Sequence, residues 1–479
     1  MGSPRIALIG AGSSVFARAL IRDTYTFPAL RDAELRLMDP DPARLADTEA
    51  IANRLKREFG GTGAITAHRD IAPAIEDADF VITMFQIGGY DPATVADFEI
   101  PKKYGLRQTI ADTLGIGGIM RALRSIPVLN DLAAQMEQHC PDALLLNYVN
   151  PMAPLVWAVS EATSIRTVGL CHSVQGTAAE LASVLGIPAA EIDYDCAGIN
   201  HMAFYTRFEQ NGQDLYPVLR AVEAARTYPA WEAPRFTLMR DFGYFVTESS
   251  EHLSEYVPWF IKDGRPDLIE KFNIPLDEYP ARCIDQIADW SSMRAALLSD
   301  DPGAIVEYQI ERGETLSGNW ERKLARERLR DPESEQRLRE LLREERLAHQ
   351  TGHSGEYGTL IIHSLTTGEP SVIWGNVPND GLIDNLPADC VVEVACDVDA
   401  NGLVPRAFGA LPPHVASLMT TNINPQRMMV HAALNHNRQS VYQAALLDPH
   451  TAAELDPDQI RALVDELIAA HGDLIPEMA

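Results

Sequence analysis

The sequence predicts an α/β fold in which a parallel sheet at the N-terminal end is followed by a second, α+β domain. The first 200 residues alternate short apolar runs with helical segments, and the first of these runs ends in glycines. After Asn200 the composition of the chain changes, with more aromatic, proline and charged residues. Apolar strands separated by helices are typical of βαβ units whose sheet is buried on both faces. We therefore expect one domain over residues 1–197 and a second over 198–479.

The elements of the first part follow in a regular order. Each strand candidate is a short, nearly continuous apolar run, and each helix candidate carries apolar residues at helical spacing. Helices are expected from Ser14 to about Tyr25 and over Asp41–Lys56. The strand candidates are Arg5–Gly10, Ala33–Met38, Phe80–Phe85, Ala143–Asn147 and Thr167–Cys171.

The second part is less regular. Phe204–Tyr216 alternates like a strand, and Ile373–Leu403 has the pattern of strands and turns. A strongly charged segment over Glu311–Arg346 predicts a surface helix or hairpin with a solvated face. The chain closes with helical segments, notably Ile460–Ala470.

Composition limits the functional classes. The chain has 479 residues, and 40 Lys and Arg against 68 Asp and Glu give a net charge of −28, which argues against a nucleic-acid surface. A hydrophobic fraction of 46% rules out wholesale disorder. We expect neither a signal peptide nor a membrane segment, because no apolar run is long enough to span a bilayer. Six scattered cysteines fit a reduced, cytoplasmic setting.

A glycine motif lies between the first predicted strand and helix. Gly10 allows a tight turn, and Gly12 lets the backbone approach a pyrophosphate, as in the Rossmann dinucleotide fingerprint. Ser13 and Ser14 open the next helix, whose amides then face that anion. Val15 stands where the third glycine of the fingerprint belongs.

Asp39 completes this signature. It ends the second strand candidate, 27 positions after Gly12, where its carboxylate can accept hydrogen bonds from an adenosine ribose. The negative charge favours NAD over NADP, although Arg44 lies nearby in the sequence. We interpret the strand, glycines, helix and aspartate together as a cofactor site, with a structural turn as the alternative.

Two residues with metal-binding side chains follow. Cys171 ends a strand candidate and His201 comes 30 residues later, so sulfur and nitrogen could ligate a divalent cation. Taken alone, this spacing fits a buried strand-end cysteine and a satisfied core histidine better than a metal site. Asn150, after the preceding strand, is suited to recognising hydroxyl or carbonyl groups, or is a turn residue beside Pro151.

Together these motifs resemble glycoside hydrolase family 4, the NAD- and metal-dependent glycosidases. Within the family, Cys171–Val174 is similar to the bacterial melibiase-type α-galactosidase subgroup, whereas the charged stretch over residues 311–354 is longer than expected for it. The matching segments cover nearly the whole chain: Gly10–Ser13, Phe85–Tyr90, Gln108–Gly115, Gly117–Arg124, Asn147–Ala153, Gly169–Thr177, Ala197–Tyr205, Gly243–His252 and Gly375–Pro387.

The resemblance implies an unusual mechanism. Most glycosidases use two carboxylates, and the NAD-dependent enzymes of this family are an exception. NAD⁺ would take a hydride from C3 of the sugar, and Mn²⁺ or another divalent metal on Cys171 and His201 would polarise the C2 and C3 oxygens. Loss of the C2 proton, elimination of the aglycone, water addition and return of the hydride would give net hydrolysis.

The resemblance also suggests roles for individual residues. His172 is the candidate acid for the leaving oxygen, or else a partner of the metal site. His252 is the candidate base at C2, with Tyr256 and Glu251 as rivals. Sugar hydroxyls or the nicotinamide side would be held by Asp112, Asn150 and Asn200.

We expect a cytoplasmic homo-oligomer, a dimer or tetramer, that acts on a small-molecule α-galactoside without nucleic-acid or membrane partners. The same chemistry on an α-glucoside, an α-glucuronide or a modified sugar is the first alternative. A dehydrogenase of the malate or lactate type, which gives the pair of Cys171 and His201 no role, and a non-catalytic NAD-sensing protein are the others.

Overall fold

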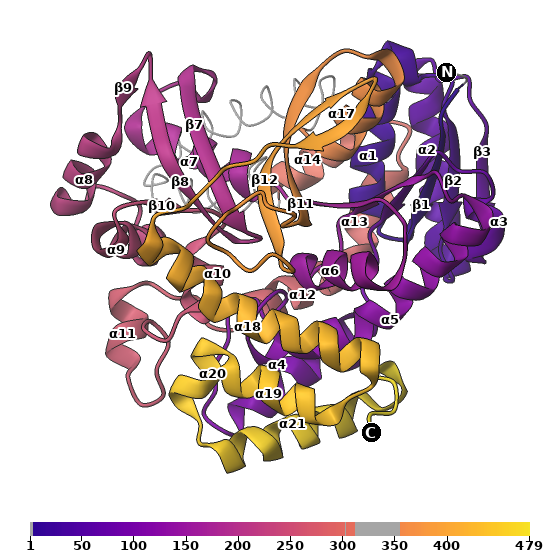
Figure 1. Cartoon of the computed structure of the whole chain (residues 1–479). Helices are drawn as coiled ribbons and strands as arrows, with labels where there is room; N and C mark the ends of the chain where they lie inside the picture. Colours follow the sequence, from indigo (N-terminus) through magenta and orange to yellow (C-terminus); the bar gives the residue numbers. More distant parts are fainter. Residues whose placement is uncertain (1–2, 302, 312–354) are drawn as a thin grey trace. The chain divides into compact units, whose positions relative to one another are not determined.

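A computed structural model describes residues 3–301, 303–311 and 355–479 (Figure 1). The chain forms two compact units. The first contains Met1–Phe85, Ile284–Ser371 and Val398–Gly402; the second contains Gln86–Cys283, Val372–Asp397 and Leu403–Ala479. Beyond its first residue, the charged segment expected over Glu311–Arg346 lies outside the described residues.

A parallel sheet forms the centre of the first unit. Its strands lie in the order β3-β2-β1-β4, and every pair is parallel. The strands are β1 (Arg5–Ile9), β2 (Glu34–Met38), β3 (Ile65–His68) and β4 (Phe80–Thr83). The helices of this unit are α1 (Ser14–Thr26), α2 (Pro42–Phe59), α3 (Ile71–Ile75), α13 (Trp290–Leu298), α14 (Ala304–Glu311) and α17 (Tyr357–Thr367).

Local sequence explains where α2 begins and ends. The Asp41 side chain accepts hydrogen bonds from the amides of Ala43 (2.8 Å) and Arg44 (3.1 Å), which would otherwise lack partners in the first turn. Pro42 opens the helix with its fixed φ, and Gly60 ends it at φ +73°. This cap fixes the chain just after Asp39.

The sheet of the second unit begins parallel and continues antiparallel. Its strand order is β5-β6-β11-β12-β7-β8-β10. The β5–β6 pair is parallel, whereas the β6–β11, β12–β7, β7–β8 and β8–β10 pairs are antiparallel. The strands are β5 (Leu144–Asn147), β6 (Thr167–Leu170), β7 (Ile192–Ile199), β8 (Met202–Gln210), β9 (Gln213–Asp214), β10 (Phe245–Val246), β11 (Ser371–Pro378), β12 (Val391–Asp399) and β13 (Gly402–Pro405).

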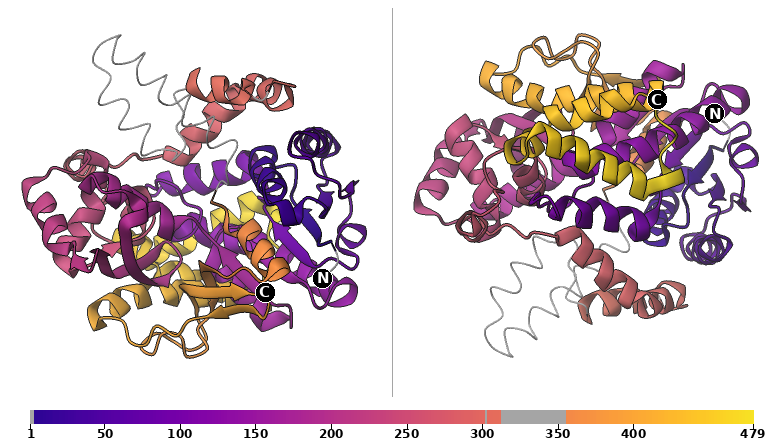
Figure 2. Two further views of the ribbon diagram at one scale, coloured as in Figure 1. Left: turned by 90° about the horizontal axis from the view of Figure 1, so that it is seen from above. Right: turned by 90° about the horizontal axis from the view of Figure 1, so that it is seen from below.

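Helices surround this second sheet, and Figure 2 shows α18, α19 and α21 lying side by side. The helices are α4 (Val95–Lys102), α5 (Gly115–His139), α6 (Met152–Ala162), α7 (Ser173–Leu185), α8 (Tyr216–Ala225), α9 (Ala233–Phe242), α10 (Ser250–Tyr256), α11 (Pro266–Lys271), α18 (Pro413–Asn435), α19 (Arg438–Leu447), α20 (Pro449–Glu454) and α21 (Pro457–His471). One more helix, α12 (Glu278–Ala288), contains the boundary between the units. Within the described ranges, no helix combines the length and apolar character that a membrane span needs.

An aromatic core supports the β7–β8 hairpin. Tyr205 and Phe208 from β8 pack with Phe236 from α9 and Phe245 from β10, and all four side chains are at most 1% exposed. The rings of Phe236 and Phe245 meet edge to face at 5.1 Å. This packing fixes the hairpin, and the turn between its strands carries His201.

The expected α/β fold class, with a parallel N-terminal sheet and a second domain, is confirmed. One local expectation is wrong, and one strand was missed. The strand predicted over Phe204–Tyr216 ends at Gln210, and Tyr216 begins α8. Strand β3 was not predicted, because its four residues are partly exposed and carry little apolar signal.

Candidate active site

The glycine loop of the first unit follows β1 directly. Gly10 has φ +87°, and a Cβ there would lie 2.9 Å from Cβ of Phe85. The Gly12 amide donates to Oδ2 of Asp39 at 2.8 Å, and a Cβ on Gly12 would lie 2.5 Å from the same oxygen. Both positions therefore require glycine for steric reasons.

Further hydrogen bonds hold this loop. The other oxygen of Asp39 accepts from the Asp41 amide at 2.9 Å, so the aspartate bridges the glycine loop and the start of α2. Ser14 lies 3.2 Å from the Thr48 hydroxyl, which donates to the carbonyl of Ala11 at 2.8 Å. Ser13, half-buried, precedes α1 as its N-cap residue. The predicted residues Gly10, Gly12, Ser13 and Ser14 thus lie in one loop at the start of α1, and Asp39, after β2, is hydrogen-bonded to it.

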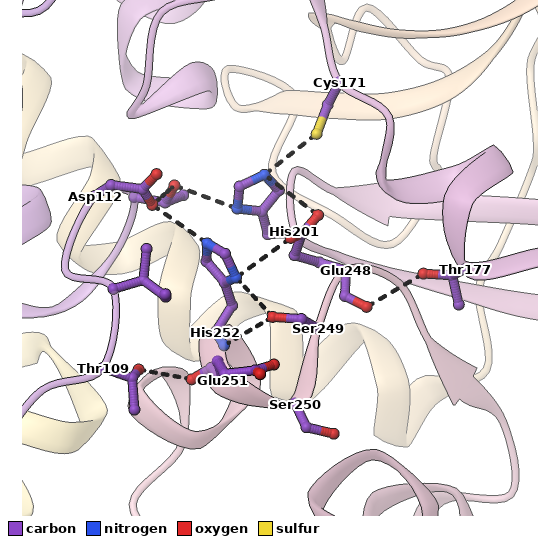
Figure 3. Close-up of polar contacts among 12 residues, drawn as sticks. Thr109, Asp112, Cys171, Thr177, His201, Glu248, Ser249, Ser250, Glu251 and His252 are labelled. Atoms are coloured by element: carbon purple, nitrogen blue, oxygen red, sulfur yellow. Dashed lines mark hydrogen bonds and ion pairs between the residues drawn. The ribbon is translucent and has the colours of Figure 1, made fainter. Parts of the chain in front are cut away.

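In the second unit, the predicted metal ligands lie together. Cys171 follows the end of β6, and His201 lies in the turn between β7 and β8 with φ +61°. Figure 3 shows Sγ of Cys171 directed at Nε2 of His201, at 3.2 Å. Glu248, between β10 and α10, places Oε2 3.9 Å from the same nitrogen. One donor atom from each of the three residues lies within 4.8 Å of the other two.

The second nitrogen of His201 has its own partners. Nδ1 lies 3.2 Å from the Tyr256 hydroxyl and 3.2 Å from the Thr113 hydroxyl. Tyr256 is fully buried, and burial raises the pKa of its phenol well above the usual value. An Nδ1–H that donates to these oxygens leaves the Nε2 lone pair facing Cys171 and Glu248. The surroundings therefore orient His201 as metal-site histidines are oriented.

The cluster favours positive charge. Burial alone would lower the pKa of His201, but the negative charges of Cys171 and Glu248 raise it to about 10. Burial would likewise raise the pKa of Glu248, yet the positive charges of His201 and His252 hold it below its usual value. A divalent cation that replaces the proton on His201 meets the same sulfur and carboxylate.

A second titratable pair adjoins this cluster. Nε2 of His252 lies 3.5 Å from Asp112, while its Nδ1 lies 2.9 Å from the Ser249 hydroxyl and 3.3 Å from Oε1 of Glu248 (Figure 3). The rings of His201 and His252 meet edge to face at 4.9 Å. Burial raises the pKa of Asp112, but hydrogen bonding and positive charge from His252 bring it well below its usual range. A histidine between two carboxylates can accept and hold a proton.

The loop that carries Asp112 is held by a buried carboxylate. Glu255 of α10 accepts hydrogen bonds from the amides of Thr109 (2.8 Å) and Ala111 (2.8 Å), and Ala111 has φ +55°. Burial raises the pKa of Glu255 to about 7. Helix α10 therefore supplies His252 to the site and also fixes the loop that supplies the partner of His252.

Two asparagines present buried polar atoms. Asn150 donates to Oδ2 of Asp112 at 3.2 Å, and its own Oδ1 has no hydrogen-bond partner among the described residues. Asn200, beside His201, is fully buried, and neither polar atom of its side chain has a partner in the described part of the chain. Such atoms are available to a bound polar molecule.

Two further predicted residues adjoin site residues in the sequence, since His172 follows Cys171 and Glu251 precedes His252. His172 is exposed, with its ring 6.5 Å from the ring of Tyr148. Glu251 is 4% exposed, and its backbone carbonyl accepts from the Thr109 hydroxyl at 2.8 Å.

Sequence reasoning missed Glu248. It belongs to the dense run of titratable residues over 243–256, but nothing in that run distinguishes it. The distinguishing feature is conformational. Glu248 has φ +69°, and its side chain joins the cluster from a segment that precedes α10. A charged, non-glycine residue in the left-handed region is worth checking for a site role.

Comparison with known proteins identifies the family of the chain. The model of the "Family 4 glycosyl hydrolase" matches residues 5–187, and that of the "Family 4 glycosyl hydrolase C-terminal domain" matches residues 196–451. An alpha-galactosidase of Bacillus subtilis is 44% identical over 475 residues, with 99% of both chains covered. One from Rhizobium meliloti is 34% identical, over 100% of this chain and 90% of the other. A 6-phospho-alpha-glucosidase from gut microorganisms, solved with NAD and Mn²⁺, has a TM-score of 0.73 at 20% identity, with all of both chains covered, and so shares the fold.

Proposed function

Because the chain belongs to family 4 of the glycosyl hydrolases, we propose that it is an α-galactosidase that uses NAD⁺ and a divalent metal ion, Mn²⁺. The observation that carries the proposal is the convergence of Cys171, His201 and Glu248, beside the pair of Asp112 and His252. The similar chains from Bacillus subtilis and Rhizobium meliloti are both named alpha-galactosidases, which supports the galactoside as substrate.

NAD⁺ is assigned to the loop at the start of α1. Gly10 and Gly12 form a tight loop against Phe85 and Asp39, in which the amides of Ser13 and Ser14 donate to the carbonyls of Gly10 (3.0 Å) and Gly12 (2.9 Å). The proposed pyrophosphate site is the start of α1, directly after this loop. Asp39 is the candidate ribose acceptor, and Asn150 the candidate contact on the nicotinamide side. The division into a cofactor domain over residues 1–197 and a substrate, metal and oligomerisation domain over 198–479 stays a prediction.

The metal is assigned to Cys171 and His201, with Glu248 as a third donor. Thiolate, imidazole and carboxylate together suit Mn²⁺ or another first-row divalent ion, and three donors leave positions open for substrate oxygens. When bound, NAD⁺ supplies a reversible oxidation at C3 of the sugar, and the metal polarises the C2 and C3 oxygens, which acidifies the C2 proton.

His252 is the candidate base at C2. It lies against the His201 ring, and its two nitrogens face the carboxylates of Asp112 and Glu248, which stabilise the imidazolium formed when a proton arrives. Tyr256 is the weaker rival, because its phenol is fully buried against His201 and its pKa is raised. Glu251 remains a rival, and its backbone carbonyl accepts a hydrogen bond from Thr109. His172, as an exposed group next to a metal ligand, is kept as the candidate acid for the leaving oxygen.

Three residues are proposed to hold the sugar. Asn150 and Asn200 offer buried polar atoms without protein partners in the described residues, and Asp112 offers carboxylate oxygens beside Asn150. These groups match the hydroxyls of a hexose. We also propose a cytoplasmic homo-oligomer, a dimer or tetramer, with a small-molecule α-glycoside as its ligand.

The test is a substrate panel. The purified protein, with NAD⁺, Mn²⁺ and a reductant, is assayed on nitrophenyl α-galactoside and on its gluco and glucurono analogues. We expect cleavage of the galactoside, and its loss when NAD⁺ or the metal is removed. Preference for another α-glycoside would support the proposed chemistry but show that galactose is not the preferred sugar. Net accumulation of NADH would indicate a dehydrogenase, and no turnover of any glycoside would indicate a non-catalytic protein.

A further inference from the structure

The backbone of Glu248 has an uncommon conformation. Its φ of +69° lies in the left-handed region, which costs a side-chain-bearing residue about 1 kcal/mol or more. In Figure 3 the carboxylate points toward His201, whereas the peptide carbonyl of the same residue points the other way, toward Thr177. Something must hold this peptide if the carboxylate is to face the cluster.

Two side chains hold that carbonyl. The Thr177 hydroxyl of α7 donates to it at 3.2 Å, and the Arg235 guanidinium of α9 donates to it through NH1. The same NH1 group donates to Oγ1 of Thr177 at 3.2 Å. The carbonyl, the hydroxyl and the guanidinium therefore form a closed triangle of hydrogen bonds.

Arg235 is itself fixed by two carboxylates. Its Nε donates to Glu232 at 2.7 Å, and its NH2 donates to Glu180 at 2.6 Å. The Arg235 side chain is 1% exposed, and its guanidinium lies 5.2 Å from the centre of the Phe245 ring. Because a buried ion pair of this kind contributes little net stability, stabilisation of the fold does not by itself explain why it is present.

We infer that Arg235, Glu232, Glu180 and Thr177, called here the Arg235 network, are positioning residues that orient the Glu248 carboxylate toward Cys171 and His201. None of the four has a role in the proposed function. The network acts through the peptide of Glu248 and not through the metal. The inference rests on the proposed function in one respect, namely that Glu248 belongs to the metal site.

The test measures Mn²⁺ binding to the full-length protein without substrate, by the loss of the electron paramagnetic resonance signal of free Mn²⁺. Thr177→Val removes one hydrogen bond to the Glu248 carbonyl and keeps the side-chain shape. We expect it to weaken Mn²⁺ binding by about fivefold, the effect of one hydrogen bond. Thr177→Ser keeps the hydroxyl and should restore binding to within about twofold of the natural protein.

A matched control tests whether removing any buried threonine hydroxyl weakens Mn²⁺ binding. Thr24 of α1 is 3% exposed and donates to the carbonyl of Leu20 at 2.8 Å. Thr24→Val should leave Mn²⁺ affinity unchanged. Arg235→Lys provides a second variant of the Arg235 network, because it keeps the positive charge between Glu232 and Glu180 but lacks the planar fork of donors. Circular dichroism shows whether each variant folds.

A double-mutant cycle with Glu248→Ala separates positioning from general support. If the Arg235 network acts through Glu248, Thr177→Val has no further effect once the Glu248 carboxylate is gone. An equal loss in both backgrounds, or no loss while Glu248→Ala weakens binding, overturns the inference but leaves the proposed metal site intact. If Glu248→Ala leaves the affinity unchanged, Glu248 is not a donor, and this part of the proposed function fails together with the inference.

Discussion

Sγ of Cys171 lies 3.2 Å from Nε2 of His201, although the two residues are 30 positions apart in the chain. Cys171 follows a parallel strand, and His201 lies in the turn of an antiparallel hairpin. The left-handed φ of +61° at His201 and the contacts of its Nδ1 with Tyr256 and Thr113 turn the ring toward the sulfur. A pair held from both sides in this way has the arrangement that the proposed metal site requires.

Removing either member of this pair should greatly weaken metal binding. We expect Cys171→Ser and His201→Ala to lower kcat by about 100-fold or more, because the remaining donors bind Mn²⁺ weakly. Mn²⁺ titration and nitrophenyl α-galactoside turnover measure the effect. Cys140→Ala is the control, since Cys140 is a buried cysteine outside the cluster and its loss should affect stability only. Full metal affinity in Cys171→Ser would show that the sulfur is not a metal ligand.

The second prediction concerns the base. His252→Gln should lower kcat by about 100-fold while Mn²⁺ affinity changes little, because His252 faces Asp112 and Glu248 and is not one of the three proposed donors. The rate at which galactose exchanges its C2 proton with solvent, followed by NMR, should fall in parallel. Tyr256→Phe is the comparison. Loss of exchange in Tyr256→Phe, with exchange retained in His252→Gln, would assign the base to Tyr256.

The third prediction tests the glycine loop. Gly12→Ala places a methyl group 2.5 Å from Oδ2 of Asp39, and the carboxylate cannot move without losing its bond to the Gly12 amide. We expect NAD⁺ affinity to fall by about tenfold or more, as judged by NAD⁺ titration. Gly176→Ala adds a methyl group that meets nothing within 4 Å, and it should bind NAD⁺ normally. Equal affinity in both variants would place the cofactor elsewhere.

The fourth prediction concerns stability and pH. Glu393 of β12 is fully buried, accepts from Asn376 at 3.3 Å, and has its pKa raised by burial from 4.5 to about 7. Between pH 4.5 and 7 the folded state keeps a proton that the unfolded state loses. This contribution to stability is therefore complete below pH 4.5 and is lost as pH rises to about 7.

Glu393→Gln removes this titration. Between pH 4.5 and 8 the free energy of unfolding of the natural protein should fall on the order of 2 kcal/mol further than that of the variant. Urea unfolding at both pH values measures this difference. Parallel stability curves for the two proteins would show that Glu393 titrates near its ordinary pKa in the folded state.

Sequence patterns predict the regular parts of this fold well. The strand that leads into Gly10 and the helix that follows are local features, and so is the aspartate that ends the second strand. Each depends on the residue types of a short window. Strand β3 is short and partly exposed, so it lacks the apolar pattern on which strand prediction depends.

The candidate site is less predictable, because its members meet only through tertiary structure. Cys171 and His201 have residue types that suggest a metal, so their pairing can be proposed from sequence. Glu248 is one of several acidic residues in its segment, and its place in the cluster depends on a left-handed backbone held by Arg235 and Thr177. No local pattern encodes that arrangement.

In the proposed mechanism the glycosidic bond breaks by elimination after C3 is oxidised, so that C2 loses its proton. Hydrolysis of an α-galactoside in D₂O, with NAD⁺ and Mn²⁺, tests it most directly through the isotope content of the released sugar. We expect one deuterium at C2 of galactose. Galactose released without deuterium at C2, or released at an equal rate by protein stripped of both NAD⁺ and metal, would contradict it.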